Sequence, residues 1–575
     1  MTPLLSVRDL KVGFGRDPKA NEVVKGVSFD LMPGETMAIV GESGSGKSVT
    51  ALSINRLVDF GGGRITHGSI TLQRADGSTL DVAQADEKTL RRLRGRDVGM
   101  IFQEPMTSLN PVHTVGAQIA EAFRLNRGLT GEAARKASLD VLERVRIPDA
   151  KTRLGYFPHQ LSGGMRQRVM IAMALASSPR LLIADEPTTA LDVTVQAQIM
   201  ALLAELKEET GMSMIFITHD IGLVAGIADR IMVMQHGLAV EQNTADAVLD
   251  NPQHDYTKHL LNAVPHFTSG AAVRTDGARA ADAEPIVKVD GLAVRFPVGK
   301  GLFKPKDAIH AVDGVSFDLM PGETLGIVGE SGSGKSTTAR AILGLVNKHR
   351  GEIATKAGRS RRPIQMVFQD PFASLNPRLD VEGLLAEPAI ANGQKLDVAL
   401  RERMKFLLER VGLPADVLQR YPHQFSGGQR QRLCIARALM LNPDVVVLDE
   451  AVSALDVSVQ ARVLDLLIDL QHEFKLAYLF ISHDMAVIER IAHRIAVMYA
   501  GRVVEIGEAR AVLSDPQHSY TKRLISAVPA VERRRQQFAV DVTQVPSLVK
   551  PAGYEPPQTL WRVAGEDHKV RLEDV

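Results

Sequence analysis

The sequence predicts an α/β fold that occurs twice along the chain. Apolar runs of four or five residues, such as MAIV at 37–40 and VVVL at 445–448, are bounded by glycine or aspartate and alternate with longer helical patterns. Such runs are typical of buried parallel strands, and their alternation with helices is typical of α/β domains. The decapeptide GESGSGKSVT at 41–50 recurs as GESGSGKSTT at 329–338, so the same domain is predicted twice.

Alignment of the chain with itself places the domain boundaries. The two copies correspond up to Pro265 and Pro529, apart from a polar insertion in the first copy within 69–97. The predicted cassettes are therefore 1–265 and 285–529. The segment 266–284 is rich in Ala, Gly and Asp without periodicity, which predicts a flexible linker.

A C-terminal extension, 530–575, has no counterpart in the first copy. Its arginine run, Arg533–Arg535, is more typical of a solvated helix face than of a binding patch.

Composition excludes several classes of protein. The 68 Lys and Arg residues nearly balance the 67 Asp and Glu residues, so the net charge indicates neither nucleic acid nor an anionic membrane as a direct partner. The one cysteine, Cys434, excludes an intrachain disulfide and a multi-cysteine metal cluster, and its apolar helical setting is typical of a core residue. No signal peptide is visible, and the most apolar window, 212–234, contains charged residues that exclude a membrane span.

The repeated glycine-rich loop predicts phosphate binding. In G-x-x-x-x-G-K-S the glycines let the backbone N–H groups turn inward around phosphate oxygens, and the helix that follows directs its positive end at the same anion. Lys47 and Lys335 would neutralise the β- and γ-phosphates, while the Ser48 and Ser336 hydroxyls would bind Mg²⁺. One such match could be an accidental loop, but each of these two follows an apolar strand and precedes a helix.

Two carboxylates end a later apolar strand in each copy. Asp185 and Asp449 follow LLIA and VVVL, at the carboxyl edge where α/β sheets bind ligands, and are expected to hold Mg²⁺. Glu186 and Glu450 come next and are placed to act as general base on the attacking water. The alternative for this pair is an ordinary acidic turn.

A histidine and a glutamine follow other strands. His219 in ITHD follows Glu186, and His483 in ISHD follows Glu450, at the same separation along the sequence. This recurrence favours a γ-phosphate contact over a structural histidine. Gln103 and Gln369 each carry a neutral amide that could reach both Mg²⁺ and the attacking water.

A second anion site is predicted in each copy. LSGGMRQR at 161–168 and FSGGQRQR at 425–432 place Ser-Gly-Gly before a long helical run, which predicts an exposed helix N-terminus with donors for phosphate. Because each copy already has a phosphate loop, this second site is explained if it serves a nucleotide held by the other copy.

These motifs, in this order and in both copies, resemble the ATP-binding cassette (ABC) family over nearly the whole chain. The ALD turns at 190–192 and 454–456 belong to the same set. The resemblance implies two tandem P-loop NTPase domains, each with a parallel-sheet core, an antiparallel β subdomain and a helical subdomain. It also implies that the cassettes pair within the chain, so that the phosphate loop of one and the signature of the other enclose each ATP, with Mg²⁺.

The resemblance assigns a role to each motif residue. Residues expected to bind ATP are Gly41, Glu42, Ser43, Gly44, Ser45, Gly46, Lys47, Ser48, Gly329, Glu330, Ser331, Gly332, Ser333, Gly334, Lys335, Ser336, Ser162, Gly163, Gly164, Ser426, Gly427 and Gly428. Catalytic residues are expected to be Glu186, Glu450, His219, His483, Gln103 and Gln369. Mg²⁺ ligands are expected to be Ser48, Gln103, Asp185, Ser336, Gln369 and Asp449. Phe14 and Phe296 are the candidates to stack on adenine. No catalytic residue is missing from either copy, so two hydrolytic sites are predicted.

Further motifs narrow the resemblance. QEPMTSLNP at 103–111, QDPFASLNP at 369–377 and the paired PQH-x-YTK segments at 252–258 and 516–522 resemble the ATPases of oligopeptide, dipeptide and nickel importers. That resemblance implies an ATPase of the cytoplasmic face of the inner membrane that energises two transmembrane permease subunits and works with a periplasmic or extracellular solute-binding protein. Nucleic acid is not an implied partner. Peptides lead as cargo, while nickel chelates, opines, glutathione-like molecules and glycosides stay open.

The alternative is a soluble tandem-cassette ATPase that acts on the ribosome or on nucleic acid. Ribosome-acting relatives usually join their cassettes by a long, charged, helical linker, and DNA-repair relatives carry zinc-binding cysteines. The short small-residue linker and the single cysteine disfavour both. A non-hydrolysing scaffold is expected to lack catalytic residues, and neither copy does.

Overall fold

The computed structural model divides the chain into two compact units. It describes residues 2–74, 76–104, 108–189, 191–263, 284–298, 307–356, 362–453, 455–528, 546–551, 553–555, 559–565 and 567–572. The first unit takes in residues 1–191 and 195–264, and the second 265–528 and 541–575. The predicted linker lies outside the described residues except at Glu284, as does Arg533–Arg535, and the predicted domain boundaries stay predictions.

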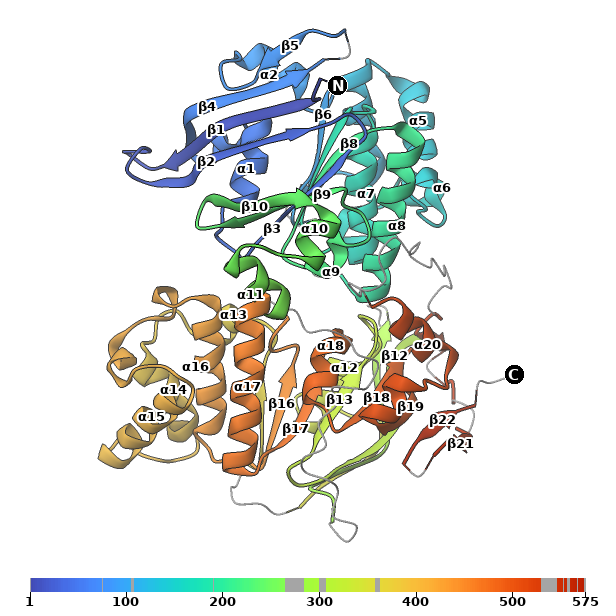
Figure 1. The fold of residues 1–575 in the computed structure, drawn as a ribbon. Coiled ribbons are helices and arrows are strands. Elements are labelled where there is room, and N and C mark those ends of the chain that lie inside the picture. The colour runs from blue at the N-terminus through green and yellow to red at the C-terminus, as the bar shows by residue number, and fades with distance from the viewer. Residues whose placement is uncertain are drawn as a thin grey trace. The chain divides into compact units, whose positions relative to one another are not determined.

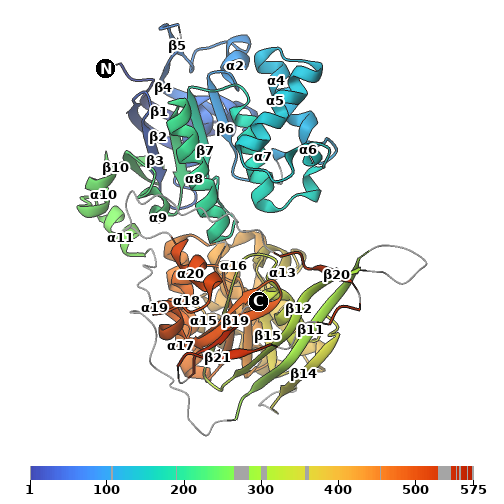
Figure 2. The ribbon, with the colours of Figure 1, turned by 90° about the vertical axis from the view of Figure 1, so that its right-hand side faces the viewer.

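An antiparallel sheet forms one layer of the first unit (Figure 2). Its strands, in the order β2-β1-β4-β5, are β1 (Leu5–Phe14), β2 (Glu22–Leu31), β4 (Gly63–Gln73) and β5 (Thr79–Asp81). Leu5 and Val7 of β1 are fully buried, as are Leu10 and Val12 beyond an irregularity in the pairing, as expected of a sheet with one face on the core. The insertion predicted from the repeat forms the end of β4, the short strand β5 and helix α2 (Glu87–Leu93).

The second sheet of this unit is the mostly parallel core. Its order is β10-β9-β3-β8-β7-β6, with β10 antiparallel at one edge. The strands are β3 (Thr36–Val40), β6 (Val98–Ile101), β7 (Leu181–Asp185), β8 (Ser213–Thr218), β9 (Arg230–Gln235) and β10 (Leu238–Thr244). Every residue of β3, β7 and β8 is buried, which explains why these strands read as continuous apolar runs rather than alternating ones.

Helices complete the first unit. They are α1 (Lys47–Ile54), α4 (Val115–Arg127), α5 (Gly131–Arg144), α6 (Ala150–Arg153), α7 (Gly163–Leu175), α8 (Val193–Thr210), α9 (Ile221–Val224), α10 (Ala245–Asp250) and α11 (Asp255–Ala263), with 3₁₀ turns η1 (Leu57–Gly61) and η2 (Pro158–Gln160). Helices α4 to α7 gather on one side of the unit (Figure 2). Apolar side chains of these helices, such as Phe123, Leu142 and Ile171, share one buried cluster.

The second unit repeats this plan. Its antiparallel sheet, in the order β14-β11-β12-β20, contains β11 (Val287–Val298), β12 (Asp307–Leu319), β14 (Arg350–Thr355) and β20 (Val549–Pro551). Its core sheet has the order β15-β16-β17-β13-β18-β19-β22-β21. The strands are β13 (Thr324–Val328), β15 (Ile364–Val367), β16 (Val445–Asp449), β17 (Ala477–Ile481), β18 (Arg494–Tyr499), β19 (Arg502–Glu508), β21 (Trp561–Val563) and β22 (Lys569–Arg571).

Its helices also follow the first unit. They are α12 (Lys335–Ile342), α13 (Pro371–Ser374), α14 (Val381–Ala391), α15 (Val398–Arg410), α16 (Gly427–Leu439), α17 (Val457–Phe474), α18 (Met485–Ile491), α19 (Ala509–Ser514) and α20 (Ser519–Ser526), with 3₁₀ turns η3 (Ala415–Gln419) and η4 (Pro422–Gln424). The predicted α/β class is confirmed in both units. Among the described residues, no helix is long and apolar enough to cross a membrane.

The two units differ at the C-terminus. The extension that has no counterpart in the first copy adds β20 to the antiparallel sheet of the second unit and β22 and β21 to its core sheet (Figures 1 and 2). The core sheet of the second unit therefore continues beyond β19, whereas in the described part of the first unit it ends at β10.

Candidate functional site: two nucleotide-binding cassettes

Each glycine-rich loop is curled around its own lysine. Lys47 Nζ donates to the carbonyl oxygens of Gly41 at 2.7 Å and Glu42 at 2.8 Å. In the second unit Lys335 Nζ donates to those of Gly329 at 2.6 Å and Glu330 at 2.9 Å. The loops lie between β3 and α1 and between β13 and α12, where the sequence predicted them.

The first glycine of each loop cannot be replaced without strain. Gly41 has φ 150° and Gly329 has φ 146°, and a Cβ at either position would overlap a backbone carbonyl oxygen, that of Met234 or Met498. These carbonyls belong to β9 and β18, the strands beside β3 and β13. Glycine at this position therefore lets the loop lie against the neighbouring strand while its N–H groups turn inward.

A hydroxyl and a carboxylate lie together behind each loop. Ser48 Oγ donates to Asp185 Oδ1 at 2.9 Å, and Ser336 Oγ donates to Asp449 Oδ1 at 2.8 Å. Burial raises the pKa of Asp185 to about 6, although the hydrogen bond from Ser48 opposes that shift. Burial likewise raises the pKa of Asp449.

These oxygen pairs fit Mg²⁺, which prefers oxygen ligands and usually takes one or two from the protein and others from phosphates and water. Within the described part of the chain, no group of three or more His, Cys, Asp or Glu side chains could hold a metal ion. One hydroxyl and one carboxylate oxygen behind each loop suit a magnesium ion whose other ligands are phosphate and water.

The predicted base of the first unit is surrounded by three polar side chains. Gln103 Nε2 donates to Glu186 Oε2 at 2.9 Å, Thr189 Oγ1 donates to the same oxygen at 2.8 Å, and His219 Nδ1 lies 3.4 Å from Oε1. Burial raises the pKa of Glu186, but the contact with His219, the hydrogen bond from Thr189 and the charge of Lys47 together outweigh it and hold the pKa at about 2. The same contact raises the pKa of His219.

The second unit repeats this arrangement with one difference. Gln369 Nε2 donates to Glu450 Oε2 at 2.7 Å, and His483 Nδ1 lies 3.6 Å from that oxygen. Burial is again outweighed by the histidine, so the pKa of Glu450 is lowered. Ser453, which replaces Thr189, instead donates to the backbone carbonyl of Glu450 at 2.9 Å.

Both glutamates have a strained backbone. Glu186 has φ 46° and Glu450 has φ 49°, in the left-handed region that side-chain-bearing residues seldom adopt. Their N–H groups donate to Ile217 and Ile481 at the ends of β8 and β17, at 2.9 and 3.0 Å. The turn therefore aims each carboxylate toward the glutamine and the histidine at the carboxyl edge of the sheet.

The signature segments begin long helices, as predicted. Ser162 Oγ accepts from Met165 N at 3.4 Å and caps α7, and Ser426 Oγ accepts from Gln429 N at 3.4 Å and caps α16. Only the second cap is reciprocal, because Gln429 Oε1 accepts from Ser426 N at 3.0 Å. The predicted part of these serines and glycines in nucleotide binding stays a prediction.

The two candidate adenine-stacking residues lie near the end of the first strand of each antiparallel sheet, Phe14 as the last residue of β1 and Phe296 two residues before the end of β11. Phe14 is half-buried against the core, and a Cβ at Gly63 would lie 2.9 Å from its ring. Phe296 occupies the corresponding place on β11 and is 40% exposed. Stacking on adenine stays a prediction for both.

The structure also identifies loop-supporting residues that the sequence reading missed. The hydroxyl of Tyr256 accepts from Glu42 N at 3.1 Å, and that of Tyr520 accepts from Glu330 N at 2.9 Å. Both tyrosines belong to the PQH-x-YTK segments, which on sequence alone indicated only the family. Their recurrence was the available signal, but their contact with a loop more than 180 residues away along the chain depends on the fold.

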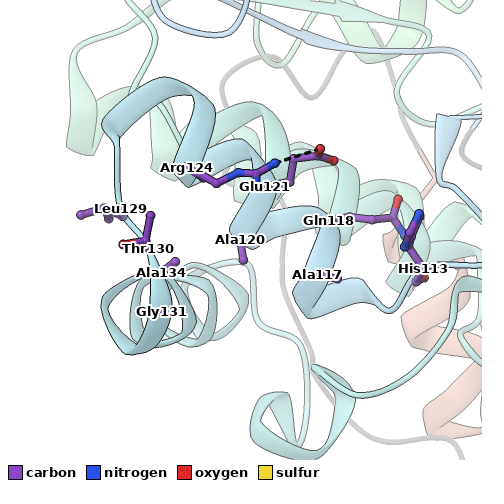
Figure 3. Close-up of a pocket in the computed structure, with 10 residues that line it drawn as sticks. All are labelled: His113, Ala117, Gln118, Ala120, Glu121, Arg124, Leu129, Thr130, Gly131 and Ala134. Atoms are coloured by element: carbon purple, nitrogen blue, oxygen red, sulfur yellow. Dashed lines mark hydrogen bonds and ion pairs between the residues drawn. The ribbon is translucent and has the colours of Figure 1, made fainter.

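A hollow of about 380 Å³ lies between α4 and α5 of the first unit (Figure 3). Its lining includes His113, Gln118 and Arg124. Gln118 ties this hollow to the segment after Gln103, because it donates to the carbonyls of Asn110 and His113 and accepts from Asn110 N at 2.9 Å.

Comparisons with known proteins agree with these motifs. The family model described as ABC transporter matches residues 24–189 and 312–453, and the model of the oligopeptide/dipeptide transporter C-terminal region matches 240–287 and 504–553. A glutathione import ATP-binding protein from Pectobacterium atrosepticum is 50% identical over 600 residues, covering 99% of this chain and 96% of that one. Proteins of the same description from Salmonella typhimurium and Escherichia coli K12 are 49% identical with the same coverage.

Proposed function

The chain belongs to the ABC transporter family and is an ATPase coupled to import, and from this premise we propose that both of its cassettes hydrolyse ATP. The observation that supports two active sites is the recurrence of a full set of groups. Each unit has a lysine within its phosphate loop, a serine–aspartate oxygen pair, and a glutamate in contact with glutamine and histidine.

The residue roles follow from this geometry. Lys47 and Lys335 would bind the β- and γ-phosphates, because their ammonium groups already lie inside the loops. Mg²⁺, when bound, would neutralise phosphate charge, and the oxygens of Ser48 with Asp185, and of Ser336 with Asp449, would hold it.

Glu186 would accept the proton of the attacking water. Its low pKa keeps the carboxylate ionised, so an oxygen is available to orient and polarise that water. His219 would contact the γ-phosphate, and its raised pKa favours the cationic form, which makes the stronger hydrogen bond to phosphate. Glu450 and His483 would act in the same way in the second cassette. We further propose that each signature serine and its glycines bind the nucleotide held by the other cassette.

We propose that the ATPase works with two transmembrane permease subunits and an extracytoplasmic solute-binding protein, at the cytoplasmic face of the membrane. The hollow between α4 and α5 is the proposed seat of a permease loop (Figure 3). The hydrogen bonds of Gln118 support this, since they connect the hollow to Asn110, which belongs to the same motif, 103–111, as Gln103. The proposed cargo is glutathione or a related small peptide, which rests on what the relatives are named for.

The test is the pair of substitutions Glu186→Gln and Glu450→Gln in one chain. ATPase activity is expected to fall by about 10²- to 10⁴-fold, the range typical of loss of a general base. The matched control is Glu205→Gln, the same change in an exposed ion pair with Arg146 on α8, which should leave activity unchanged. Undiminished hydrolysis by the double variant would contradict the base assignment.

The same double variant tests the partners. Purified in mild detergent with ATP and Mg²⁺, it is expected to bring down two integral membrane subunits. Cells that depend on the transporter should then lose uptake of labelled glutathione with the double variant and keep it with the Glu205→Gln control. If the membrane subunits co-purify but glutathione uptake does not change, the proposed cargo is contradicted and the proposed permease partners are not.

A further inference from the structure

The C-terminal extension joins both sheets of the second cassette. Strand β20 pairs antiparallel with β12, and β22 pairs antiparallel with β19, with Val570 opposite Glu505. Between these two attachments lie Tyr554 and β21. One short segment is therefore fastened at two places on the same cassette.

The surface that receives the extension differs from its counterpart in the first copy. Four receiving positions carry residues of another kind at the equivalent place in the repeat. His310, Asp313, Arg502 and Gly507 stand where the first copy has Glu22, Lys25, Leu238 and Asn243. The glycine matters sterically, because a Cβ on Gly507 would lie 3.1 Å from the Cα of His568. At these four positions the second cassette therefore carries residues that the first does not, and Gly507 leaves room for the extension.

The attachment at β22 reaches the phosphate loop through one buried carboxylate. His568 Nε2 lies 2.7 Å from Glu505 Oε1, and the two side chains are 7% and 0% exposed. Glu505 also accepts from the N–H groups of Gln517 and His518, at 2.8 and 2.9 Å. The helix that follows contains Tyr520, whose hydroxyl accepts from the loop.

The first copy has the same support without the histidine. Glu241 accepts from the N–H groups of Gln253 and His254, at 2.8 and 3.0 Å, and Tyr256 follows. Glu241 is half-buried, whereas Glu505 is fully buried beneath β22. His568 thus adds a buried side-chain hydrogen-bond partner to a support that both loops share.

The attachment at β20, which Tyr554 follows, reaches the other side of the same loop. The carbonyl of Tyr554 accepts from Arg295 at 3.0 Å, and its ring packs edge-on against His310 at 5.6 Å. Tyr554 also forms a side-chain hydrogen bond with Arg502, which makes a largely buried ion pair with Asp313 at 2.9 Å. Asp313 N donates to Gly501 O at 2.8 Å, and Gly501 N donates to the carbonyl of Ser333, inside the phosphate loop, at 3.0 Å.

We propose that the C-terminal extension is a clasp that positions the phosphate loop of the second cassette and tightens nucleotide binding there. His568 and Tyr554 are its positioning residues, since they act through Glu505 and through the ion pair of Arg502 with Asp313. Among the residues that the structure describes, the strands of the extension join only the sheets of the second cassette, so the two sites bind ATP with different affinities. This inference rests on the proposed ATP sites.

The experiment isolates one site at a time. In a Lys47→Ala background only the second cassette is expected to bind, and in a Lys335→Ala background only the first. A trinitrophenyl-labelled ATP is titrated into each full-length protein with Mg²⁺. Adding His568→Ala should raise the dissociation constant about three- to tenfold in the Lys47→Ala background, the effect of losing the typical net contribution of one hydrogen bond. In the Lys335→Ala background His568→Ala should leave it unchanged.

Controls separate positioning from folding. His568→Gln keeps an N–H donor toward Glu505 and should recover most of the affinity. Trp561, the only tryptophan of the chain, lies on β21, so its fluorescence reports release of the extension in urea. Because coupling is reciprocal, nucleotide should shift that release to higher urea in the Lys47→Ala protein only. If His568→Ala unfolds the second cassette, Tyr554→Ala tests the other attachment in the same titration.

The outcomes distinguish the clasp from the sites. If either lysine variant retains two equivalents of bound nucleotide, the site assignment fails. Alternatively, each lysine variant binds one equivalent of nucleotide, while the extension variants change the dissociation constant equally in both backgrounds or in neither. That result would overturn the proposed role of the extension and leave the ATP-site assignment intact.

Discussion

Replacing Gly164 with alanine tests why the signature needs glycine. Gly164 lies in the first turn of α7, and a Cβ there would lie 2.5 Å from Val195 Cγ1 on α8. Overpacking of this kind costs about 1–3 kcal/mol. Alanine in place of glycine within a helix gains only about 0.5–1 kcal/mol. The steric cost wins, so Gly164→Ala should lower the free energy of unfolding of the first cassette by roughly 1–2 kcal/mol.

The partner substitution Val195→Ala completes the test. It removes the methyl group that the new Cβ would overlap, so the double variant should be more stable than the sum of the single effects by about 1–3 kcal/mol. Urea unfolding followed by circular dichroism measures all four proteins. Additive effects would refute the packing argument.

ATPase activity then decides what the glycine is for. If Val195→Ala also restores the activity that Gly164→Ala removes, the glycine serves packing of α7 on α8. If stability recovers and activity does not, close approach of the backbone to a phosphate is the reason. The pair Gly428 and Val459 offers the same test in the second cassette, where the overlap is equally severe.

Two further predictions concern single side chains. Burial raises the pKa of Cys434 to about 12, so at pH 8 its thiolate fraction is about a thousandfold below that of an ordinary thiol. Labelling by a disulfide reagent should therefore be slow until urea unfolds the second cassette. Rapid labelling of the native protein would contradict this. Gln429→Met should lower the urea midpoint of the second cassette by removing one capping hydrogen bond of about 0.5–1 kcal/mol, and Met165→Gln should raise that of the first cassette by a similar free energy; unchanged midpoints in both would show that the reciprocal cap contributes nothing.

The fold class was predictable because the strongest sequence signals are local. Strands β3 and β7 appear as unbroken apolar runs in the sequence because both of their faces are buried. The phosphate loops are recognisable from their glycines, which adopt a conformation that few other residues allow. Strand β20 gave no such signal. It is three residues long, Val-Lys-Pro, and forms because the edge of β12 is available to pair with it, which is a tertiary effect.

The site shows the same division. The pairing of Ser48 with Asp185 followed from two motifs whose chemistry already required a common ligand. The hydroxyl of Tyr256 on the phosphate loop did not follow, because nothing in a helix-start motif specifies which distant backbone group its tyrosine will reach. Contacts of this kind arise from packing of α11 beside the loop, and sequence periodicity carries no information about them.

The left-handed backbone at Glu186 and Glu450 has a consequence for protein engineering. A side-chain-bearing residue held in that conformation costs roughly 1–3 kcal/mol, and the chain bears the cost twice. Selection for heat resistance alone would therefore favour glycine at both positions, where it relieves strain and removes the carboxylate together. Any thermostable variant obtained without selection for transport should be sequenced first at these two codons, because a gain in stability from glycine there would be accompanied by loss of the proposed catalytic carboxylate.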